Sequence, residues 1–533
     1  MRFASGKIPF APHAALLVLL PLVLGCTSTR QWIANDFKVG PAYCRPDAAV
    51  ADDWIDADDQ RLRNESVDHA AWWTVFDDPV LDGLIAEAYG QNLPLRVAGF
   101  RILEARSLRA IAAGNVLPQQ QQAFADYSYN VNSLRSFGLP LPNRQFSLWD
   151  GGFNLAWELD FWGRFRRAVE AADADLNASI ENYDDVLVTL LADVATTYVD
   201  IRTLERRLEL ARSNIALQKG SFDLADLRKQ GGASNSLDVE QAKSNLAQTE
   251  AFVPQLEIAL RQSQNQLCVL LGIPPEDLNQ RLAAAPIPTA PAEVALGVPG
   301  ELLRRRPDVR RAERQLAAQS ARIGVAEAEF YPHIAVTGVI GVEANQFQDL
   351  FKSGASIGSV GPSLRWNVLN YGRILNSVRA EDARFQQAAL TYQQTVLLAN
   401  AEAENAVVTF LRSQQRRDAL ARSSAAARRS NELVSSLFRA GDANGQLDRV
   451  FVIQSFLVQQ EDAEAQAEGE VAKSLIAVYR ALGGGWQIRL GIGGEGVVRL
   501  PDAAPPPDVP PDVPPMPASQ PAPLPLDAPP EPK

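Results

Sequence analysis

The stretch Gly151–Arg164, GGFNLAWELDFWGR, has a close echo about two hundred residues later in Gly361–Arg373, GPSLRWNVLNYGR. Both copies carry Trp and close on Gly-Arg, and the matching residues Trp157 and Trp366 lie 209 positions apart. Apolar and polar residues alternate through much of both copies, which is typical of a half-buried β-strand. The echo indicates that the chain contains two copies of one structural unit.

The same alternation occurs in four segments, two in each half of the chain. Each has about the 9–11 residues that a membrane β-strand requires. We therefore expect four strands with one apolar face each. Their apolar positions are Ala123, Ala125, Tyr127, Tyr129 and Val131; Phe153, Leu155, Trp157 and Leu159; Ile334, Val336, Gly338 and Ile340; and Val360, Pro362, Leu364, Trp366 and Val368.

Helices are expected on both sides of each strand pair. Residues 93–117 and 306–331 form helical tracts before the strands. After the first pair, a long helix is expected over residues 165–229, about 100 Å at 1.5 Å per residue, with a return helix ending near residue 271. The second half repeats this pattern up to residues 439 and 482. An apolar row recurs at every seventh position and predicts a coiled-coil seam: Ile180, Leu187, Val194, Ile201, Leu208, Ile215 and Phe222.

The repeat unit is therefore helix, two strands, long helix and return helix, and the expected fold is mainly α with a membrane β-barrel. Four strands cannot close a barrel, because the smallest transmembrane barrels have about eight. Unpaired strand edges in lipid cost several kcal/mol for each polar group. Strands that cross a membrane would thus force oligomerisation, with eight strands in a dimer and twelve in a trimer.

The N-terminus is typical of an exported lipoprotein. A basic start and an apolar run from Ala14 to Leu24 indicate a signal peptide over residues 1–25. Gly25 and Cys26 resemble the end of a bacterial lipobox, so Cys26 is expected to carry a covalent lipid. No apolar stretch after residue 25 approaches the length of a membrane helix.

Composition excludes several classes of function. The net charge of −12 disfavours nucleic-acid binding. With three His and three Cys, the chain is poorly supplied for metal centres, so no metal or cofactor is expected beyond the lipid. A Cys44–Cys268 disulfide remains open at this point. No nucleophile–base arrangement suggests an enzyme.

Five motifs in this order resemble the TolC-type outer-membrane factors of tripartite efflux pumps, in their lipoprotein (NodT-like) branch. They are Val39–Pro46, Trp72–Pro79, Trp157–Arg164, Arg305–Arg310 and Ala481–Trp486. The resemblance implies a homotrimer with a 12-stranded barrel in the outer membrane of a Gram-negative bacterium and a long periplasmic α-helical tunnel. It also implies docking to a periplasmic adaptor and an inner-membrane pump.

The resemblance further implies a gate where the long and return helices meet. Asp238 and Asp448 fall at these turns, and Asp448 fits a gate aspartate of the family. The family's second gate aspartate has no match, because Val450 and Phe451 occupy that region, which suggests a more apolar constriction. Alternatively, both acids simply favour helix N-termini. The adaptor-contact tips would be Gly231, Gly232, Gly441, Asp442, Asn444 and Gly445.

The expected organisation is a signal peptide (1–25), a lipidated extension (26–70), two repeats (71–290 and 291–486) and a Pro-rich disordered tail (487–533). The expected function is a passive efflux conduit for small molecules. Two alternatives remain: the outer-membrane component of a type I protein secretion system, and a lipid-anchored periplasmic coiled-coil scaffold without a barrel.

Overall fold

The computed structural model describes residues 28–63, 69–132, 145–232, 234–440 and 447–491, and the statements below concern these residues. They belong to the first of two compact units, residues 1–492. Several predicted features lie outside the described residues: Cys26, the tip residues Gly441, Asp442, Asn444 and Gly445, and the chain beyond residue 491.

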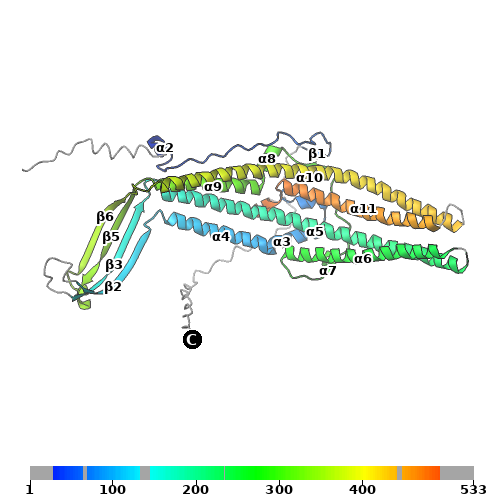
Figure 1. The fold of residues 1–533 in the computed structure, drawn as a ribbon, viewed down its shortest axis with the longest axis horizontal. Helices are drawn as coiled ribbons and strands as arrows, with labels where there is room; N and C mark the ends of the chain where they lie inside the picture. The colour runs from blue at the N-terminus through cyan, green and yellow to red at the C-terminus, as the bar shows by residue number, and fades with distance from the viewer. Residues whose placement is uncertain (1–27, 64–68, 133–144, 233, 441–446, 492–533) are drawn as a thin grey trace, which may run out of the picture. The chain divides into compact units, whose positions relative to one another are not determined.

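The two halves of this unit repeat one order of elements, as Figure 1 shows. The first half contains α3 (Pro79–Gln91), α4 (Leu93–Gly114), β2 (Gln120–Val131), β3 (Gln145–Leu159), α5 (Arg164–Gln230) and α6 (Ser236–Leu271). The second contains α8 (Pro299–Arg305), α9 (Pro307–Ala328), β5 (His333–Ala344), β6 (Ser356–Arg365), α10 (Arg373–Ala440) and α11 (Leu447–Ala481). Short elements complete the unit: α2 (Thr29–Ala34), β1 (Leu62–Arg63), η2 (Trp72–Phe76), α7 (Asn279–Leu282), β4 (Val294–Ala295), η3 (Phe347–Phe351) and η4 (Trp486–Leu490).

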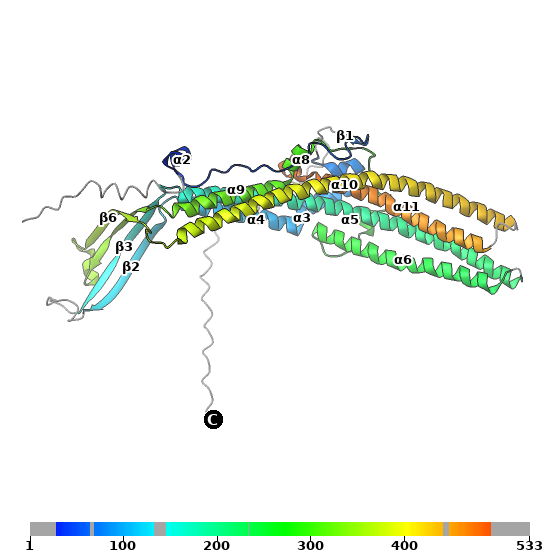
Figure 2. The ribbon, with the colours of Figure 1, turned by 45° about the horizontal axis from the view of Figure 1, so that its top comes forward.

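The long helices pack along the predicted apolar seam. Leu187, Val194 and Ile201 of α5 are fully buried, and α5 contacts α4, α6, α9 and α11. In Figure 2 the α5–α6 and α10–α11 hairpins extend side by side away from the strands. The seam predicted from the heptad row is confirmed. None of the helices in the described residues combines the length and the apolar composition needed to cross a membrane.

Strands β2, β3, β5 and β6 form one antiparallel sheet in that order, so the two repeats join between β3 and β5. The register places the predicted apolar residues on one face: Ala123 lies opposite Phe153, Phe153 opposite Ile340, and Gly338 opposite Val360. Phe153, Ile340 and Val360 are each more than 60% exposed, so the rest of the described chain leaves this face uncovered.

The repeated Trp has the same role in both halves. The indole Nε1 of Trp157 donates a hydrogen bond of 3.1 Å to the carbonyl oxygen of Val116. That of Trp366 donates one of 2.9 Å to the carbonyl oxygen of Phe330. Each acceptor lies two residues before the proline that opens the preceding strand. The echo is thus explained for Trp: each copy ties the end of a strand pair to the point where its first strand begins.

The repeated Gly turns the chain into the long helix. Gly163 and Gly372 have φ values of +80° and +78° and directly precede α5 and α10. Residues with a side chain rarely adopt this backbone conformation, whereas glycine adopts it without steric cost. At Gly163 a Cβ would also overlap Lys38. At position 163, the backbone conformation and the close contact with Lys38 therefore both require glycine.

The expectation that the fourth strand includes Trp366 and Val368 is wrong. β6 ends at Arg365, whose partner in β5 is His333. The residue before His333 is Pro332, which has no N–H to continue the ladder. The indole of Trp366 instead bonds to the helix–strand junction.

The main core lies where the helices of both repeats meet. Trp72 and Trp73 are buried there with Tyr198 and Phe410. Cys268 is buried in the same core, whereas Cys44 is exposed, and both are free thiols. The Cys44–Cys268 disulfide that the sequence left open is therefore absent from this structure.

Candidate functional site

The turn from α5 to α6 forms the first tip. The Gly231 N–H donates to the Leu227 carbonyl oxygen over 3.0 Å and so caps α5. Gly232 follows with a φ of +74°, and a Cβ there would meet nothing within 4 Å. Backbone conformation, not crowding, therefore explains the glycine at this position. Both residues are exposed, as an adaptor contact would need.

Asp238 helps to begin α6. Its N–H donates to Asn235 Oδ1 over 3.0 Å, and its Oδ2 accepts from the Asn235 N–H over 3.5 Å. This reciprocal arrangement is a capping box, which satisfies backbone donors at the start of the helix. The alternative interpretation of Asp238 as a helix-capping acid thus has direct structural support, and its role in a gate stays a prediction.

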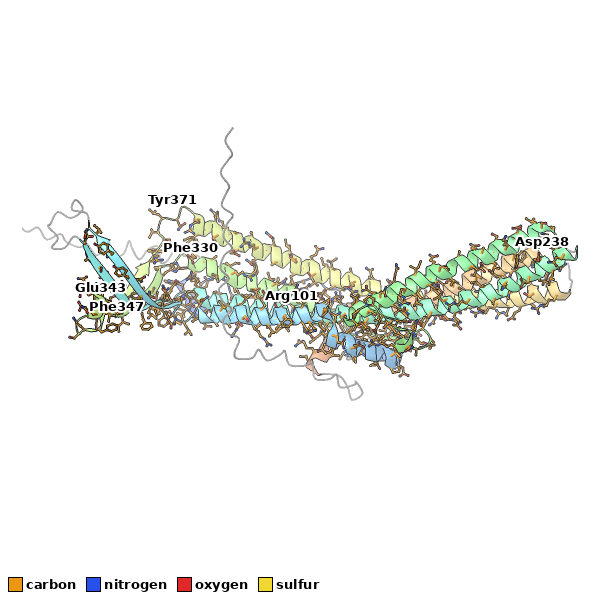
Figure 3. The ribbon with its side chains drawn as sticks, turned by 90° about the horizontal axis from the view of Figure 1, so that it is seen from below. Arg101, Asp238, Phe330, Glu343, Phe347 and Tyr371 are labelled. Carbon is orange, nitrogen blue, oxygen red and sulfur yellow. The ribbon has the colours of Figure 1, made fainter. Side chains whose placement is uncertain are left out.

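Asp448 lies in the first turn of α11 and is exposed. Figure 3 places Asp238 at the end of the helices farthest from the strand-end residues Glu343 and Phe347. The helix turns expected to form the gate and adaptor contact are therefore at the end opposite the sheet.

Val450 and Phe451 are 3% and 2% exposed. They belong to an apolar group that we call the tip cluster, because it joins the two hairpins next to their turns. Both side chains pack against the neighbouring helices of the same copy, and their part in an apolar constriction stays a prediction. The tip cluster consists of Ala225, Val239, Ala242, Val434, Phe438, Leu447, Val450 and Phe451.

A group of hydrogen-bonded polar side chains, the polar layer, lies next to the tip cluster on the same helices. Glu461 accepts from Asn214 Nδ2 over 3.0 Å and from Arg428 Nε over 2.8 Å. Gln454 Nε2 donates to Ser221 Oγ over 2.8 Å. Asn214, Gln454 and Glu461 are each less than 10% exposed. The hairpins are thus joined here by polar contacts in place of apolar ones.

The motif Arg305–Arg310 acts at the centre of the chain, through Arg306. Its guanidinium donates to the Ala481 carbonyl oxygen over 2.5 Å and forms ion pairs with Asp308 at 2.9 Å and Glu402 at 2.6 Å. We call Arg306, Asp308 and Glu402 the central clamp. It ties the start of α9 to α10 and to the end of α11. Burial alone would raise the pKa of Asp308, but the Arg306 guanidinium outweighs it and holds that pKa below its ordinary value.

The chain stays ordered past Trp486. Arg489 in η4 pairs with the fully buried carboxylate of Asp184 over 2.7 and 3.0 Å. Arg310 lies over the Trp486 ring, 4.3 Å from its centroid. Arg489 thus anchors η4, which continues to Leu490, three residues beyond the expected start of the tail at residue 487.

Sequence reasoning missed both the polar layer and the clamp. One signal was available for the layer: Gln218 occupies a position in the second apolar row of α5, between Ala211 and Ala225, and it is 4% exposed. A polar residue in such a row marks an interruption of the seam. The contacts of Arg306 with Ala481 and Glu402 join distant segments, and no spacing in the sequence indicates them.

Comparison with known proteins agrees with this arrangement. The family model described as Outer membrane efflux protein matches residues 84–273 and 298–484, which correspond to the two repeats. The chain is 30% identical to Nodulation protein T of Rhizobium leguminosarum bv. trifolii, over 84% of this chain and 94% of that protein. It is 31% identical to the Pyoverdine export outer membrane protein OpmQ of Pseudomonas putida, over 78% of this chain and 88% of that protein.

Solved structures agree as well. The outer-membrane channel OprN matches with a TM-score of 0.79 and 34% identity, over 84% of this chain and 99% of that chain. The family model covers most of the chain, and the relatives and the solved structure match it over nearly their whole length. Sequence and structure therefore indicate the same family. The chain belongs to the outer membrane efflux protein family.

Proposed function

We propose that three copies of this outer-membrane efflux chain form one passive conduit, in which the four strands of each copy close a 12-stranded barrel. The observation that carries the proposal is the sheet. Its outer strands β2 and β6 are each paired on one side only among the described residues, and its exposed face is apolar. Neighbouring copies would pair these edges, as closure in lipid requires.

Exposed apolar residues on the helices support the same assembly. Val97, Phe100, Leu108 and Ile111 of α4 are each more than 50% exposed. Leu390, Leu397 and Leu398 of α10 are similarly uncovered. Rows of apolar side chains that face solvent in a single copy favour packing against another copy. A tunnel wall made of such helices would extend from the barrel.

The conduit would perform no chemistry, and its energy would come from an inner-membrane pump reached through a periplasmic adaptor at the tips. Small molecules are the proposed cargo, supported by the relative named for pyoverdine export. A type I protein secretion role and a scaffold without a barrel remain the alternatives. Family membership favours the channel over the scaffold.

The gate would lie at the tip, where the tip cluster holds the two hairpins of one copy together. Phe451 of α11 packs there with residues of α5, α6 and α10. Opening of the gate would separate these hairpins. Because this would expose Phe451 to water, the free energy of its burial would favour the closed state. The acids Asp238 and Asp448 would favour cations at this entrance.

The lipid on Cys26 would anchor the mature N-terminus to the membrane. The segment that follows is held at the base of the sheet. Trp32 packs against Trp162, with ring centroids 5.5 Å apart, and Arg166 donates to the carbonyl oxygens of Asp36 and Phe37. These contacts would keep the lipidated end beside the strands.

Cross-linking of the sheet edges tests the proposal. One cysteine on β2 combined with one on β6 in the same chain, in a Cys44→Ser background, should give covalently linked oligomers on oxidation, up to a trimer, because β2 of one copy would face β6 of the next. Cysteines at Phe153 and Ile340, which face each other within one chain, should link only internally. A monomeric mass by light scattering, with no linked oligomer in any register, would contradict the proposal.

A further inference from the structure

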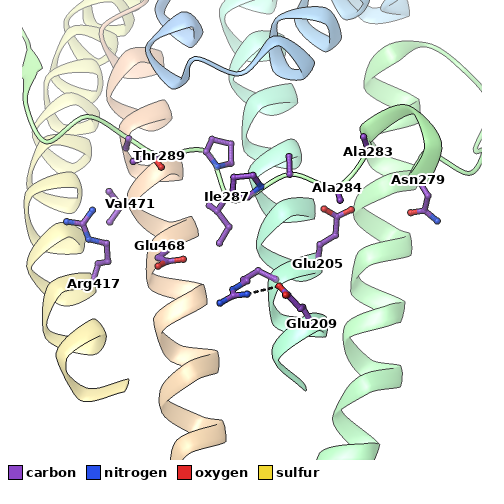
Figure 4. A pocket seen from close by; sticks show the side chains of 15 residues that line it. Glu205, Glu209, Asn279, Ala283, Ala284, Ile287, Thr289, Arg417, Glu468 and Val471 are labelled. Carbon is purple, nitrogen blue, oxygen red and sulfur yellow. Dashed lines mark hydrogen bonds and ion pairs between the residues drawn. The ribbon is translucent and has the colours of Figure 1, made fainter. Parts of the chain in front are cut away.

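A short segment, residues 283–290, crosses α5, α11 and α10, and we call it the crossing strap (Figure 4). One end is fixed by Arg202, which donates to the carbonyl oxygens of Leu282 at 2.5 Å and Ala283 at 2.7 Å. The other end is fixed where Gln414 donates to the Ala292 carbonyl oxygen over 3.2 Å. Between these anchors the backbone makes no hydrogen bond to any described residue.

The sequence of the strap sets which backbone donors are available. Pro286 and Pro288 lack an N–H and hold the residues before them extended. The donors left between the two anchors of the strap belong to Ala284, Ala285, Ile287, Thr289 and Ala290. Three of them, Ala285, Ile287 and Thr289, recur at every second residue, the spacing at which one edge of an extended strand presents its N–H groups. An edge of this kind is a template for a further strand.

The strap borders a cavity of about 910 Å³. Three carboxylates line it, those of Glu205 and Glu209 on α5 and that of Glu468 on α11, together with the guanidinium groups of Arg206 and Arg417 (Figure 4). Two of these already have arginine partners: Arg202 pairs with Glu205 at 2.9 Å, and Arg206 with Glu209 at 2.6 Å.

Glu468 differs from the other two acids. Its carboxylate makes no hydrogen bond or ion pair within the described residues. Burial raises its pKa, and the neighbouring Glu464 raises it further, while Arg206 and Arg417 act in the opposite direction. Glu468 is also exposed, so a cationic group of a partner could reach it, and an opposite charge within a few ångströms favours the ionised carboxylate.

We propose that the crossing strap and its cavity bind an extended segment of a partner protein that carries basic side chains. The backbone of the segment would pair with the free donors of Ala285, Ile287 and Thr289 as an added strand. One basic side chain would enter the cavity and pair with Glu468. This surface is on the central part of the chain, far from the tips, so it does not rest on the channel proposal.

Binding of a labelled peptide to the purified full-length protein tests this. The probe is acetyl-Arg-Val-Arg-Val-Arg-amide, with acetyl-Glu-Val-Glu-Val-Glu-amide as the charge control. The basic peptide should bind saturably and the acidic peptide should not. Thr289→Pro removes one donor and should weaken binding about tenfold, whereas Thr289→Val should not. Glu468→Gln should weaken it about three- to tenfold, whereas Glu250→Gln on α6 should not.

Four results would overturn the inference. The first is no saturable binding of the basic peptide, and the second is equal binding of the acidic one. The third is an ethylguanidinium ion that competes as tightly as the peptide, which would assign the cavity to small cations. The fourth is a Thr289→Cys variant that maleimide cannot label in the purified oligomer, which would show that a second copy already covers the strap.

Discussion

The centre of the chain and its tip hold the same long helices by different means. At the centre, α5, α10 and α11 bury large side chains such as Tyr198, Phe410 and Leu475 completely, and Arg306 adds an ionic clamp. At the tip, the contacts between the hairpins include the eight-residue tip cluster and the polar layer, and fewer large side chains are buried. The helices are thus fixed at one level and separable at another.

Because of this difference, we expect the hairpins to separate at the tip more easily than at the centre, without loss of the fold. Buried polar contacts contribute little net stability, because folding exchanges them for contacts with water. Buried apolar area stabilises at roughly 25 cal/mol per Å². A hairpin pair held by one small cluster beside polar contacts therefore opens before the central core does. The following predictions test this contrast.

Removal of the central clamp should have the largest effect. Arg306→Ala leaves Asp308 without its buried partner, and we expect a loss of about 3–5 kcal/mol in the free energy of unfolding. Arg305→Ala, at an exposed neighbour, should change it little. Chemical denaturation followed by circular dichroism measures both. Equal effects from the two variants would mean that the clamp contributes nothing beyond surface charge.

Phe451→Ala should have the next largest effect, and it should be confined to the tip. Truncation of a buried Phe costs about 3 kcal/mol, so amides near the turns of α6 and α11 should exchange with solvent faster. Phe456→Ala, on the same helix but 48% exposed, is the matched control. Faster exchange that extends to the central core would contradict the separation of the two regions.

The polar layer should show a change of sign between single and double variants. Ser221→Ala leaves the buried Gln454 amide unpaired and should destabilise the tip by about 1–2 kcal/mol. Adding Gln454→Leu removes the unpaired group and should recover that loss or exceed it. The same exchange experiment reads out both. Additive losses would show that this contact is not a coupled pair.

Asp238→Ala should weaken the start of α6 by about 0.5–1 kcal/mol, because it removes the capping box. Asp448→Ala, with its exposed side chain, should cost less. Local exchange in the first turn of each helix, at residues 236–240 of α6 and 447–451 of α11, gives the comparison. If Asp238→Ala instead leaves exchange unchanged and lowers cation preference in conductance, Asp238 acts as a gate acid and not as a cap.

Acid should weaken the centre through Asp308. Because the pKa of Asp308 is lowered in the folded chain, its contribution is present above its ordinary pKa and is lost as pH falls through the folded value. Unfolding should therefore become easier below the ordinary carboxyl range. Arg306→Ala should reduce this dependence, and an unchanged slope of stability with pH in that variant would contradict the assignment.

The sequence was sufficient where periodicity controls structure. The heptad row identified α5, and the glycines that flank it placed its ends within one residue of the observed Arg164 and Gln230, while the alternation located the four strands. It was insufficient where distant segments meet. The sequence could not show that Phe451 packs with Phe438, because Phe438 belongs to another helix. It could not show where β6 ends either, because that end is set by the neighbouring strand β5.

Conductance of the purified protein in a planar bilayer, with its mass from light scattering, tests the central claim most directly. We expect a trimer with a small conductance that rises in Phe451→Ala and not in Phe456→Ala. A large conductance that Phe451→Ala leaves unchanged would contradict a gate held by the tip cluster, and a non-conducting monomer would contradict the channel itself.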